Sequence, residues 1–592
     1  MTPVDRLSAT NLLRIVIILP QRNQDAISNL VQDIYDPSST NFHRYLTPAQ
    51  FNERFAPANA DYQTVIGFAK THGLTVTRTV PGRTIVEVDA AVADIEKAMH
   101  VTLHLYQHPT EPRQFFAPDV EPSLDLEVPV LVVRGLNNYA IPHHISHIGN
   151  GGTPATAMGG SFPWGTSNSI YMASDIRHAY VPGTPLTGAG QVLGLMEFDG
   201  YTPADITAYE ATNGLPNVHI QEVFVGWSGP NNPNNGDPEP GVDIDMAIAM
   251  APGLSEVVFY YGNNNPHADS MLTEMADPTQ GEPLPLQLSS SWGYPLDAIT
   301  DTAFVRFAVQ GQSFFGVSGD GGSYPMQAHY AQYVTAVGGT ELAMSGLGAS
   351  WSNETVWGNG QPPGTGEAHG SGGGIVTNVP IPAYQQPVNM TAVGGSPVWR
   401  NLPDVAMVSD NLMGFLTGTD GVQQIESFSG TSFSTPLWAG FTALVNEQAA
   451  ALKQGPVGFL NPALYAIGLG PNYSSCFHDV TVGNNTWSNS PGAYFAAPGY
   501  DLCTGWGSPK GASLINLLAR WSGAVWVDFN YTGSLQTGSF TNPYPTLAKG
   551  TNAVASGGTI FIKTAGSSPE TMTISKPMTI NAIGGAATIG HQ

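Results

Sequence analysis

The sequence predicts an α/β protein with a mostly parallel sheet, and three observations support this fold class. Short, near-continuous apolar runs recur between helical segments in the centre of the chain, which is typical of parallel strands covered on both faces. A Ser/Thr-rich turn leads directly into a long Ala-rich helix after Pro436. The two ends of the chain differ from the centre in residue composition and pattern, which indicates further domains. The expected central strands are 191–198, 222–226, 256–261, 284–291, 313–318 and 334–338.

The N-terminal region, up to about residue 140, predicts a small α+β domain. It alternates short strands with segments of helical spacing, and one strand pair is joined by the turn at Pro81 and Gly82. We expect a sheet with helices packed on it. The expected strands are 12–19, 74–79 and 84–88, and the expected helices are 60–72 and 91–100.

Two changes of composition divide the rest of the chain. Residues 143–170 are rich in Gly, Pro, Ser and Thr with almost no charge, which predicts an exposed linker open to proteolysis. After Trp521, short strands separated by Gly and Asn suggest the first rungs of a β-solenoid. The predicted tail strands are 558–562, 572–574 and 578–580, and the predicted domains are 1–142, 143–170 (linker), 171–520 and 521–592.

The composition disfavours two classes of partner. The 592 residues contain 20 Lys+Arg against 45 Asp+Glu, a formal net charge of -25, so nucleic acid and anionic membranes are poor partners. The apolar run 12–19 contains Arg14 and ends at Pro20, so it is too short to span a membrane. No signal peptide is visible. A surface poor in Lys tolerates acid, which is compatible with an extracellular, acidic setting.

A serine near residue 430 is a candidate nucleophile. The stretch 427–436 reads Ser-Phe-Ser-Gly-Thr-Ser-Phe-Ser-Thr-Pro, and it places Ser432 at the start of the Ala-rich helix. Unpaired N–H groups and the positive end of the helix dipole stabilise an oxyanion there. The alternative is a Ser/Thr-rich helix cap without chemistry. A base elsewhere in the chain decides between the two.

Three carboxyl groups are candidates for that base and its partners. Glu239 and Asp243 lie one turn apart on a predicted helix whose first position suits Pro240, so the two carboxyls share one face and their titrations couple. A solvated acidic helix start is the alternative. Asp320 follows an apolar strand in Gly-Asp-Gly-Gly, where an Asp also serves simply to form a turn.

Together these four residues resemble the motifs of the sedolisin family, the kumamolisin-like serine-carboxyl peptidases (family S53). The family's Glu-x-x-x-Asp corresponds to Glu239 and Asp243. Its Gly-Asp turn corresponds to Asp320, and its Ser-Gly-Thr-Ser-x-x-x-Pro to residues 429–436. The resemblance covers roughly residues 10 to 520. It implies a subtilisin-like catalytic domain behind a ferredoxin-like activation prodomain, and so a secreted, acid-active endopeptidase made as a zymogen.

The resemblance also implies roles for these residues. In acid an imidazole of pKa ~6.5 is already protonated, whereas a carboxyl near ~4.3 still accepts the serine proton. Glu239 is then the general base and later the acid, and Asp243 orients it. A protonated Asp320 donates a hydrogen bond to the oxyanion. Glu197 and Trp292 match positions of an extended hydrogen-bond chain, although core packing is the simpler interpretation of Trp292.

The segment after residue 475 is a candidate structural loop. Cys476 and Cys503 are 27 residues apart, and we expect one disulfide between them, with two reduced thiols as the alternative. Carboxylates and carbonyls in this loop suit Ca²⁺ better than zinc, although turn aspartates would look the same. The family's calcium loop implies one Ca²⁺ ion here, with ligands from Asp479, Val480, Ala497, Gly499 and Asp501.

Two rival functions are compatible with parts of the sequence. A true subtilisin would use Asp320, His369 and Ser432, but the interval from His369 to Ser432 is short for that family. A catalytically silent adhesion protein is suggested by the solenoid-like tail, and the intact set of candidate catalytic residues argues against it. We therefore expect a monomeric peptidase whose partners are protein or peptide substrates and its own inhibitory prodomain.

Overall fold

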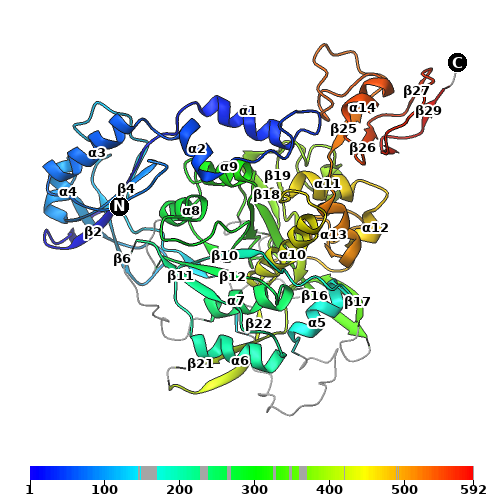
Figure 1. Cartoon of the computed structure of the whole chain (residues 1–592). Helices are drawn as coiled ribbons and strands as arrows, with labels where there is room; N and C mark the ends of the chain where they lie inside the picture. The colour runs from blue at the N-terminus through cyan, green and yellow to red at the C-terminus, as the bar shows by residue number, and fades with distance from the viewer. Residues whose placement is uncertain are drawn as a thin grey trace.

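The computed structural model arranges the chain as three regions, each with its own main hydrophobic core (Figure 1). These cores are formed by residues 7–136, 171–519 and 525–580. The large central region, mostly cyan to yellow in Figure 1, lies below the blue N-terminal region and the orange-to-red C-terminal region. The structure describes residues 1–144, 147–148, 170–226, 238–262, 268–323, 329–345, 350–358, 370–418, 420–487, 490 and 492–590.

The N-terminal region is a four-stranded antiparallel sheet with strand order β3-β4-β2-β7. Three helices lie between β2 and β3, and the last of them, α3, packs on the sheet together with α4, which follows β4; this is the ferredoxin-like arrangement. The predicted strands and helices are thus confirmed to within a few residues. The elements are β2 (Leu12–Ile18), α3 (Asn59–Thr71), β3 (Thr75–Thr79), β4 (Ile85–Ala91), α4 (Val92–Met99) and β7 (Val132–Arg134), with β1 (Asp5–Arg6), α1 (Gln24–Tyr35), α2 (Pro48–Phe55), β5 (Leu103–Gln107) and β6 (Gln114–Pro118) around them.

The central region is built on an eight-stranded sheet in which every pair except β16–β17 is parallel. The strand order is β11-β12-β10-β13-β15-β16-β17, and β20 also pairs with β16. The α/β prediction is therefore confirmed. The strands are β10 (Val192–Glu197), β11 (Ile220–Phe224), β12 (Glu256–Tyr261), β13 (Gln287–Ser290), β15 (Ser313–Val317), β16 (Thr335–Ser345), β17 (Ser350–Val356) and β20 (Val405–Val408).

Both faces of this sheet are buried, which explains the continuous apolar runs in the sequence. In β10, Leu195 packs into the core with α7 and α10, while the next residue, Met196, packs into a second core with α8 and α9. Successive side chains point to opposite faces of a strand, so both must be apolar. The covering helices are α5 (Ala173–Tyr180), α6 (Pro203–Asn213), α7 (Glu239–Met250), α8 (Ala268–Ala276), α9 (Asp301–Gln310), α10 (Thr431–Ala451) and α13 (Gly511–Ala519).

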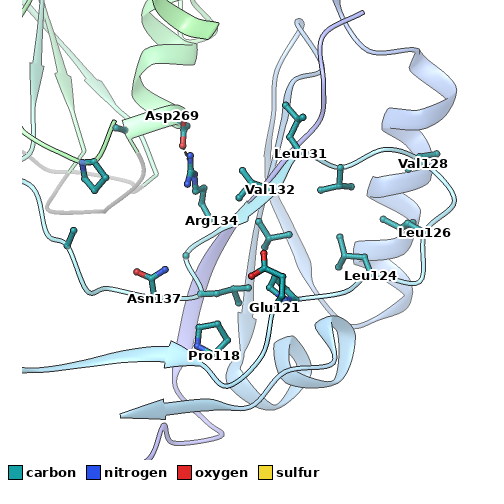
Figure 2. Close-up of a pocket in the computed structure, with 18 residues that line it drawn as sticks. Pro118, Glu121, Leu124, Leu126, Val128, Leu131, Val132, Arg134, Asn137 and Asp269 are labelled. Carbon is teal, nitrogen blue, oxygen red and sulfur yellow. Dashed lines mark hydrogen bonds and ion pairs between the residues drawn. The ribbon is translucent and has the colours of Figure 1, made fainter. Parts of the chain in front are cut away.

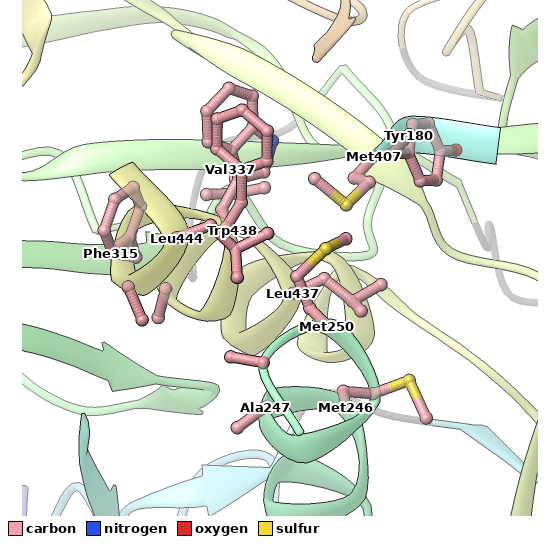
Figure 3. Packing of buried hydrophobic residues seen from close by; sticks show 14 of the residues in the cluster. Tyr180, Met246, Ala247, Met250, Phe315, Val337, Met407, Leu437, Trp438 and Leu444 are labelled. Atoms are coloured by element: carbon pink, nitrogen blue, oxygen red, sulfur yellow. The ribbon is translucent and has the colours of Figure 1, made fainter. Parts of the chain in front are cut away.

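The packing of α10 against α7 positions the catalytic candidates, because Ser432 begins one helix and Glu239 the other. Figure 3 shows Met246, Ala247 and Met250 of α7 beside Leu437 and Trp438 of α10. Gly440 allows the close approach: a Cβ there would lie 2.9 Å from the Met250 Cβ and 3.0 Å from the Ala247 carbonyl oxygen. A larger residue at 440 would push the helices apart.

The N-terminal region contacts the central region through both apolar and charged groups. Helices α1 and α2 pack on α9 in a shared apolar cluster. Arg78 on β3 forms ion pairs with Glu87 of its own sheet, at 2.7 Å, and with buried Glu274 of α8. Arg134 pairs with Asp269, at 2.9 Å, and with Asp297, at 2.6 Å. Arginines of the first region thus meet carboxylates of the second.

A cavity lies at this junction, and Ser432 does not line it. It has a volume of about 540 Å³ between residues 118–140 and the central residues Ala268, Asp269 and Pro295 (Figure 2). The ion pair of Arg134 and Asp269 lines it. Because no catalytic candidate contributes to its wall, this cavity is not the active site.

The C-terminal region stacks three parallel strands. β25 (Ala524–Val527), β26 (Thr559–Ile562) and β28 (Thr579–Ala582) pair in register, and β27 (Gly566–Ser568) pairs in parallel with β29 (Ala587–Ile589). Parallel stacking of this kind agrees with a β-solenoid, which stays a prediction. The strand expected at 572–574 is wrong: those residues form no strand, and Met572 and Ile574 are exposed.

The remaining elements surround the sheet. They are β8 (His143–His144), β9 (His147–Ile148), β14 (Trp292–Gly293), β18 (Gly374–Pro380), a 3-10 helix (Met390–Val393), β19 (Trp399–Leu402), β21 (Leu412–Thr417), β22 (Gln423–Ser429), α11 (Asn461–Gly468), α12 (Tyr473–Cys476), β23 (Phe477–His478), β24 (Ser508–Pro509) and α14 (Leu547–Ala553). In the described part of the chain, no helix combines the length and apolar character that a membrane span needs.

Candidate active site

The candidate site lies at the carboxyl ends of the central strands, where active sites of parallel sheets are found. Glu197 is the last residue of β10, Ser291 follows β13, and Asp320 comes three residues after β15. The starts of α7 and α10 complete the site with Glu239 and Ser432. The structure therefore brings together residues that are almost 240 positions apart in the sequence.

Ser432 is the second residue of α10 and is buried, with 1% of its surface exposed. Its hydroxyl has no hydrogen-bond partner among the residues that the structure describes. A buried hydroxyl without a partner is costly in a structural position, because the lost hydrogen bond is worth about 1–3 kcal/mol. This argues against a simple cap at the start of the helix.

Asp320 is held against the same helix start. Its Oδ1 accepts hydrogen bonds from the Thr431 backbone N–H, at 2.8 Å, and from the Thr431 hydroxyl, at 2.7 Å. Burial raises the pKa of Asp320 well above its usual range, and the nearby charge of Glu239 raises it further. The carboxyl is thus kept neutral, which leaves its other oxygen able to donate a hydrogen bond next to Ser432.

Glu239 and Asp243 lie on α7, which begins at Glu239, one residue earlier than the sequence predicts. Both carboxyls are buried, with 1% and 0% exposed, so a solvated acidic helix start is excluded. The Ser291 hydroxyl donates to the Asp243 Oδ1, at 2.9 Å, and is also 3.1 Å from the Ser432 carbonyl oxygen. Ser291 therefore ties the two helix starts together.

The carboxylates continue into a hydrogen-bonded chain. The Trp292 indole N–H donates to the Glu197 Oε2, at 2.7 Å, and Glu197 in turn hydrogen bonds to Asp243. Burial raises the pKa of Asp243 well above its usual range, and the charges of Glu197 and Glu239 add to the shift. Three carboxyls in one buried cluster must share protons, because like charges at such separations cannot all ionise.

Sequence reasoning missed Ser291 and Thr431. Both stand directly beside residues that it singled out, in Ser-Ser-Trp-Gly and Gly-Thr-Ser, but a serine or threonine in such a stretch gives no signal of its own. His369, the base of the subtilisin alternative, lies outside the described residues.

Two short strands of the linker, β8 and β9, pair with strands that carry or precede residues of the site. β8 pairs antiparallel with β14, so that His144 lies opposite Trp292. β9 pairs antiparallel with β22, so that His147 lies opposite Ser429, three residues before Ser432. Strand addition of this kind is how an extended peptide binds along an exposed edge. β8 and β9 therefore pair with strands of the central region in the way that an added peptide strand does.

A parallel sheet that carries a buried serine at a helix start, beside buried carboxyls, defines a serine peptidase of the carboxyl type. The comparisons with known proteins agree. Kumamolisin from Bacillus sp. (strain MN-32) is 30% identical over 486 residues, which cover 77% of this chain and 83% of that protein. Sedolisin from Pseudomonas sp. (strain 101) is 27% identical over 534 residues, covering 86% and 87%.

The chain belongs to the sedolisin family and is a serine-type peptidase precursor. The family model for the Pro-kumamolisin activation domain matches residues 1–154. The solved structure of Pseudomonas sedolisin complexed with two molecules of pseudo-iodotyrostatin covers 60% of this chain and 98% of its own, with 25% identity and a TM-score of 0.50.

The predicted disulfide is wrong. Cys476 and Cys503 are both free thiols in the structure, and both are buried. Cys476 packs into the main central core, whereas Cys503 packs with Val356 and Val480 in a separate small cluster. The two cysteines are close in the sequence, but their side chains do not form a disulfide because each packs in a different hydrophobic cluster.

The candidate calcium loop gathers oxygen donors. Asp479 accepts hydrogen bonds from the Gly499 N–H, at 3.1 Å, and Asp501 from the Ala497 N–H, at 2.9 Å, so both carboxylates reach the same three-residue segment. The described residues contain no group of three or more His, Cys, Asp or Glu side chains suited to a metal. A cation here would therefore need carbonyl ligands too, such as that of Val480, which is a donor set that suits Ca²⁺.

We expect Ca²⁺ to raise the melting temperature of the full chain, and a chelator to lower it, because an ion that binds only the folded loop stabilises it by mass action. Asp479→Ala is the variant of choice, since Asp479 is exposed. Asp501→Ala is less informative because Asp501 also accepts from the N–H groups of Cys503 and Thr504. The measurement is thermal unfolding at a moderately acidic pH, with and without chelator. An unchanged melting curve, together with no calcium by elemental analysis, refutes the site.

Proposed function

We propose that this chain is the zymogen of a secreted, acid-active endopeptidase that cleaves proteins and peptides through an acyl-enzyme on Ser432. The observation that carries the proposal is the buried cluster of carboxyls beside the free Ser432 hydroxyl. In this scheme residues 1–142 are the inhibitory prodomain, 143–170 the linker, 171–520 the monomeric catalytic domain and 521–592 an extension.

The chemistry follows from the protonation states. Glu239 takes the proton of the Ser432 hydroxyl as Oγ attacks the substrate carbonyl, and Asp320 donates a hydrogen bond to the oxygen that becomes negative. Glu239 then gives the proton to the leaving amine, and the acyl-enzyme remains. Water, activated by Glu239, cleaves the ester and restores the serine. Asp243, Glu197 and Trp292 hold Glu239 in place.

The linker supports endopeptidase activity. β8 and β9 follow each other in the linker and pair with two different strands next to the site, which favours a site that takes a chain continuing in both directions. An enzyme limited to the chain end would need a barrier on one side. The same segment blocks the site in the precursor, so removal of the prodomain must accompany activation.

The test is self-processing of the purified full chain. Brought below about pH 5, where a carboxyl base and a neutral Asp320 coexist, the precursor is expected to cut one of the bonds that join His144 to His147. In the sequence these bonds join β8, which pairs with β14, to β9, which pairs with β22. N-terminal sequencing identifies the cut, and the mature product is then assayed on a denatured protein from acidic to neutral pH.

Three outcomes contradict the proposal. A new N-terminus inside residues 1–140 or beyond Tyr171 places the linker wrongly. Activity that is greatest at neutral pH and lost on His369→Ala makes the enzyme a subtilisin. Processing that continues in the Ser432→Ala precursor assigns the cut to another protease.

A further inference from the structure

His329 is a buried histidine that no step of the proposed mechanism uses. It is 1% exposed, and its Nε2 lies 2.9 Å from the Trp292 carbonyl oxygen. A carbonyl oxygen only accepts, so Nε2 must carry the proton and donate it. The other ring nitrogen, Nδ1, then has no proton, and it has no hydrogen-bond partner among the described residues. The ring is therefore fixed in one tautomer by a single contact.

The surrounding residues are shaped to hold this ring. A Cβ at Gly316 would lie 2.1 Å from the His329 Nδ1, so the imidazole fits only because residue 316 is glycine. The ring packs against Tyr294, with centroids 4.8 Å apart, and against Phe314, at 6.0 Å. The backbone N–H of His329 donates to the Val317 carbonyl of β15, at 2.9 Å.

The ring stays a neutral donor in moderate acid. Burial lowers the pKa of His329 to about 4. The titratable group in ring contact with it is the Tyr294 phenol, whose own pKa is raised by burial, so Tyr294 is uncharged. No carboxylate or cation among the described residues contributes to the His329 shift. The hydrogen bond to Trp292 is thus present over the pH range in which a carboxyl-based peptidase works.

The Trp292 carbonyl oxygen belongs to a residue that contacts both the linker strand and the carboxyl chain. Its residue belongs to β14, the short strand on which β8 of the linker lies as an extended peptide. The side chain of the same residue holds Glu197, which hydrogen bonds to Asp243. β14 is only two residues long, and in the described part of the chain its one strand partner is β8. One hydrogen bond therefore affects both the peptide strand and the carboxyl chain.

We propose that His329 is a positioning residue for peptide hydrolysis: its Nε2–H anchors the Trp292 carbonyl, and thereby fixes both the strand that binds the substrate backbone and the indole that holds Glu197. This inference rests on the proposed function for its effect on catalysis. Its structural part is that the hydrogen bond from His329 holds β14 in place. This part does not depend on the proposed catalytic mechanism.

The experiment uses two amides that differ in reach. The Gln side chain places its NH₂ group near the position of Nε2, whereas the shorter Asn places it near Nδ1. His329→Gln is therefore expected to keep the hydrogen bond and His329→Asn to lose it. In the full-length precursor at acidic pH, we expect the self-processing rate of His329→Gln to stay within about threefold of the wild type, and that of His329→Asn to fall about tenfold or more, as loss of a buried hydrogen bond implies.

A second measurement does not depend on catalysis. In the Ser432→Ala background, hydrogen exchange of the peptides that contain residues 143–144 and 290–295 is compared between the two variants. We expect faster exchange with His329→Asn and wild-type exchange with His329→Gln. Equal exchange in both variants, or equal processing rates, overturns the proposal and leaves His329 as a packing residue. If no precursor processes but the exchange differs, the proposed function fails while the anchoring role of His329 stands.

Discussion

Ser432→Ala is expected to abolish both self-processing and peptide hydrolysis, lowering kcat by about 10⁴-fold or more, as for removal of the nucleophile in other serine peptidases. The physical reason is that the other hydroxyls at the start of α10 already have partners: those of Ser434 and Thr435 donate to the Thr431 carbonyl oxygen. The Thr431 hydroxyl is already engaged by Asp320, at 2.7 Å. The measurement is single-turnover processing of the precursor at acidic pH, followed by gel and mass spectrometry.

Thr442→Ala is the matched control. Thr442 lies on the same helix and is equally buried, but its hydroxyl donates to the Trp438 carbonyl, at 2.9 Å, three turns away from Ser432. This variant is expected to process at nearly the wild-type rate, with a small loss of stability of about 1 kcal/mol. If both variants lose activity together, the effect of Ser432→Ala reflects damage to the helix and not loss of a nucleophile.

The second large effect is expected at Asp320. Removal of one oxyanion donor costs about 10²–10³ in kcat, so Asp320→Ala should lose this much at every pH. Asp320→Asn should lose far less, because its Oδ1 can accept the same two hydrogen bonds from Thr431 and its NH₂ group can donate to the oxyanion. The measurement is kcat/KM against pH for the processed enzymes.

The pH dependence separates the two variants further. In the wild type the neutral form of Asp320 is the donor, so activity falls as the pH rises through its raised pKa. Asn does not titrate, and the alkaline limb of Asp320→Asn is therefore expected to move to higher pH. An unchanged alkaline limb would show that another group controls it, with Asp243 the next candidate.

The free energy of unfolding should also decrease as the pH rises. A carboxyl whose folded pKa is raised by burial stabilises the fold fully below its unfolded pKa, and this contribution is lost as the pH rises through the folded value. Burial raises the pKa of both Asp243 and Asp320, so the protein should become less stable from acidic toward neutral pH on their account. The Asp320→Asn variant lacks the titrating carboxyl, so its stability should decrease less between acidic and neutral pH than that of the wild type. Thermal unfolding at several pH values measures this difference.

Residue patterns predicted the structure correctly where the whole pattern lies within one helix or strand. The near-continuous apolar runs of β10 and β12 predicted the parallel sheet, and the glycine and proline positions predicted the starts of α7 and α10 to within one residue. The strand expected at 572–574 failed because strand formation there depends on a neighbour. Its residues alternate correctly, but no strand lies beside them.

The sequence by itself determined the α/β class and the separate N-terminal domain, and it singled out Glu239, Asp243, Asp320 and Ser432 as candidates because their motifs together resemble those of one family. Only the tertiary structure decided that Cys476 and Cys503 are apart, that Ser291 bridges Asp243 to the Ser432 backbone, and that His329 supports Trp292. These contacts join residues from different strands and helices. Their geometry depends on how the sheet is ordered and how closely α7 and α10 approach at Gly440, and neither is encoded in any single stretch of the chain.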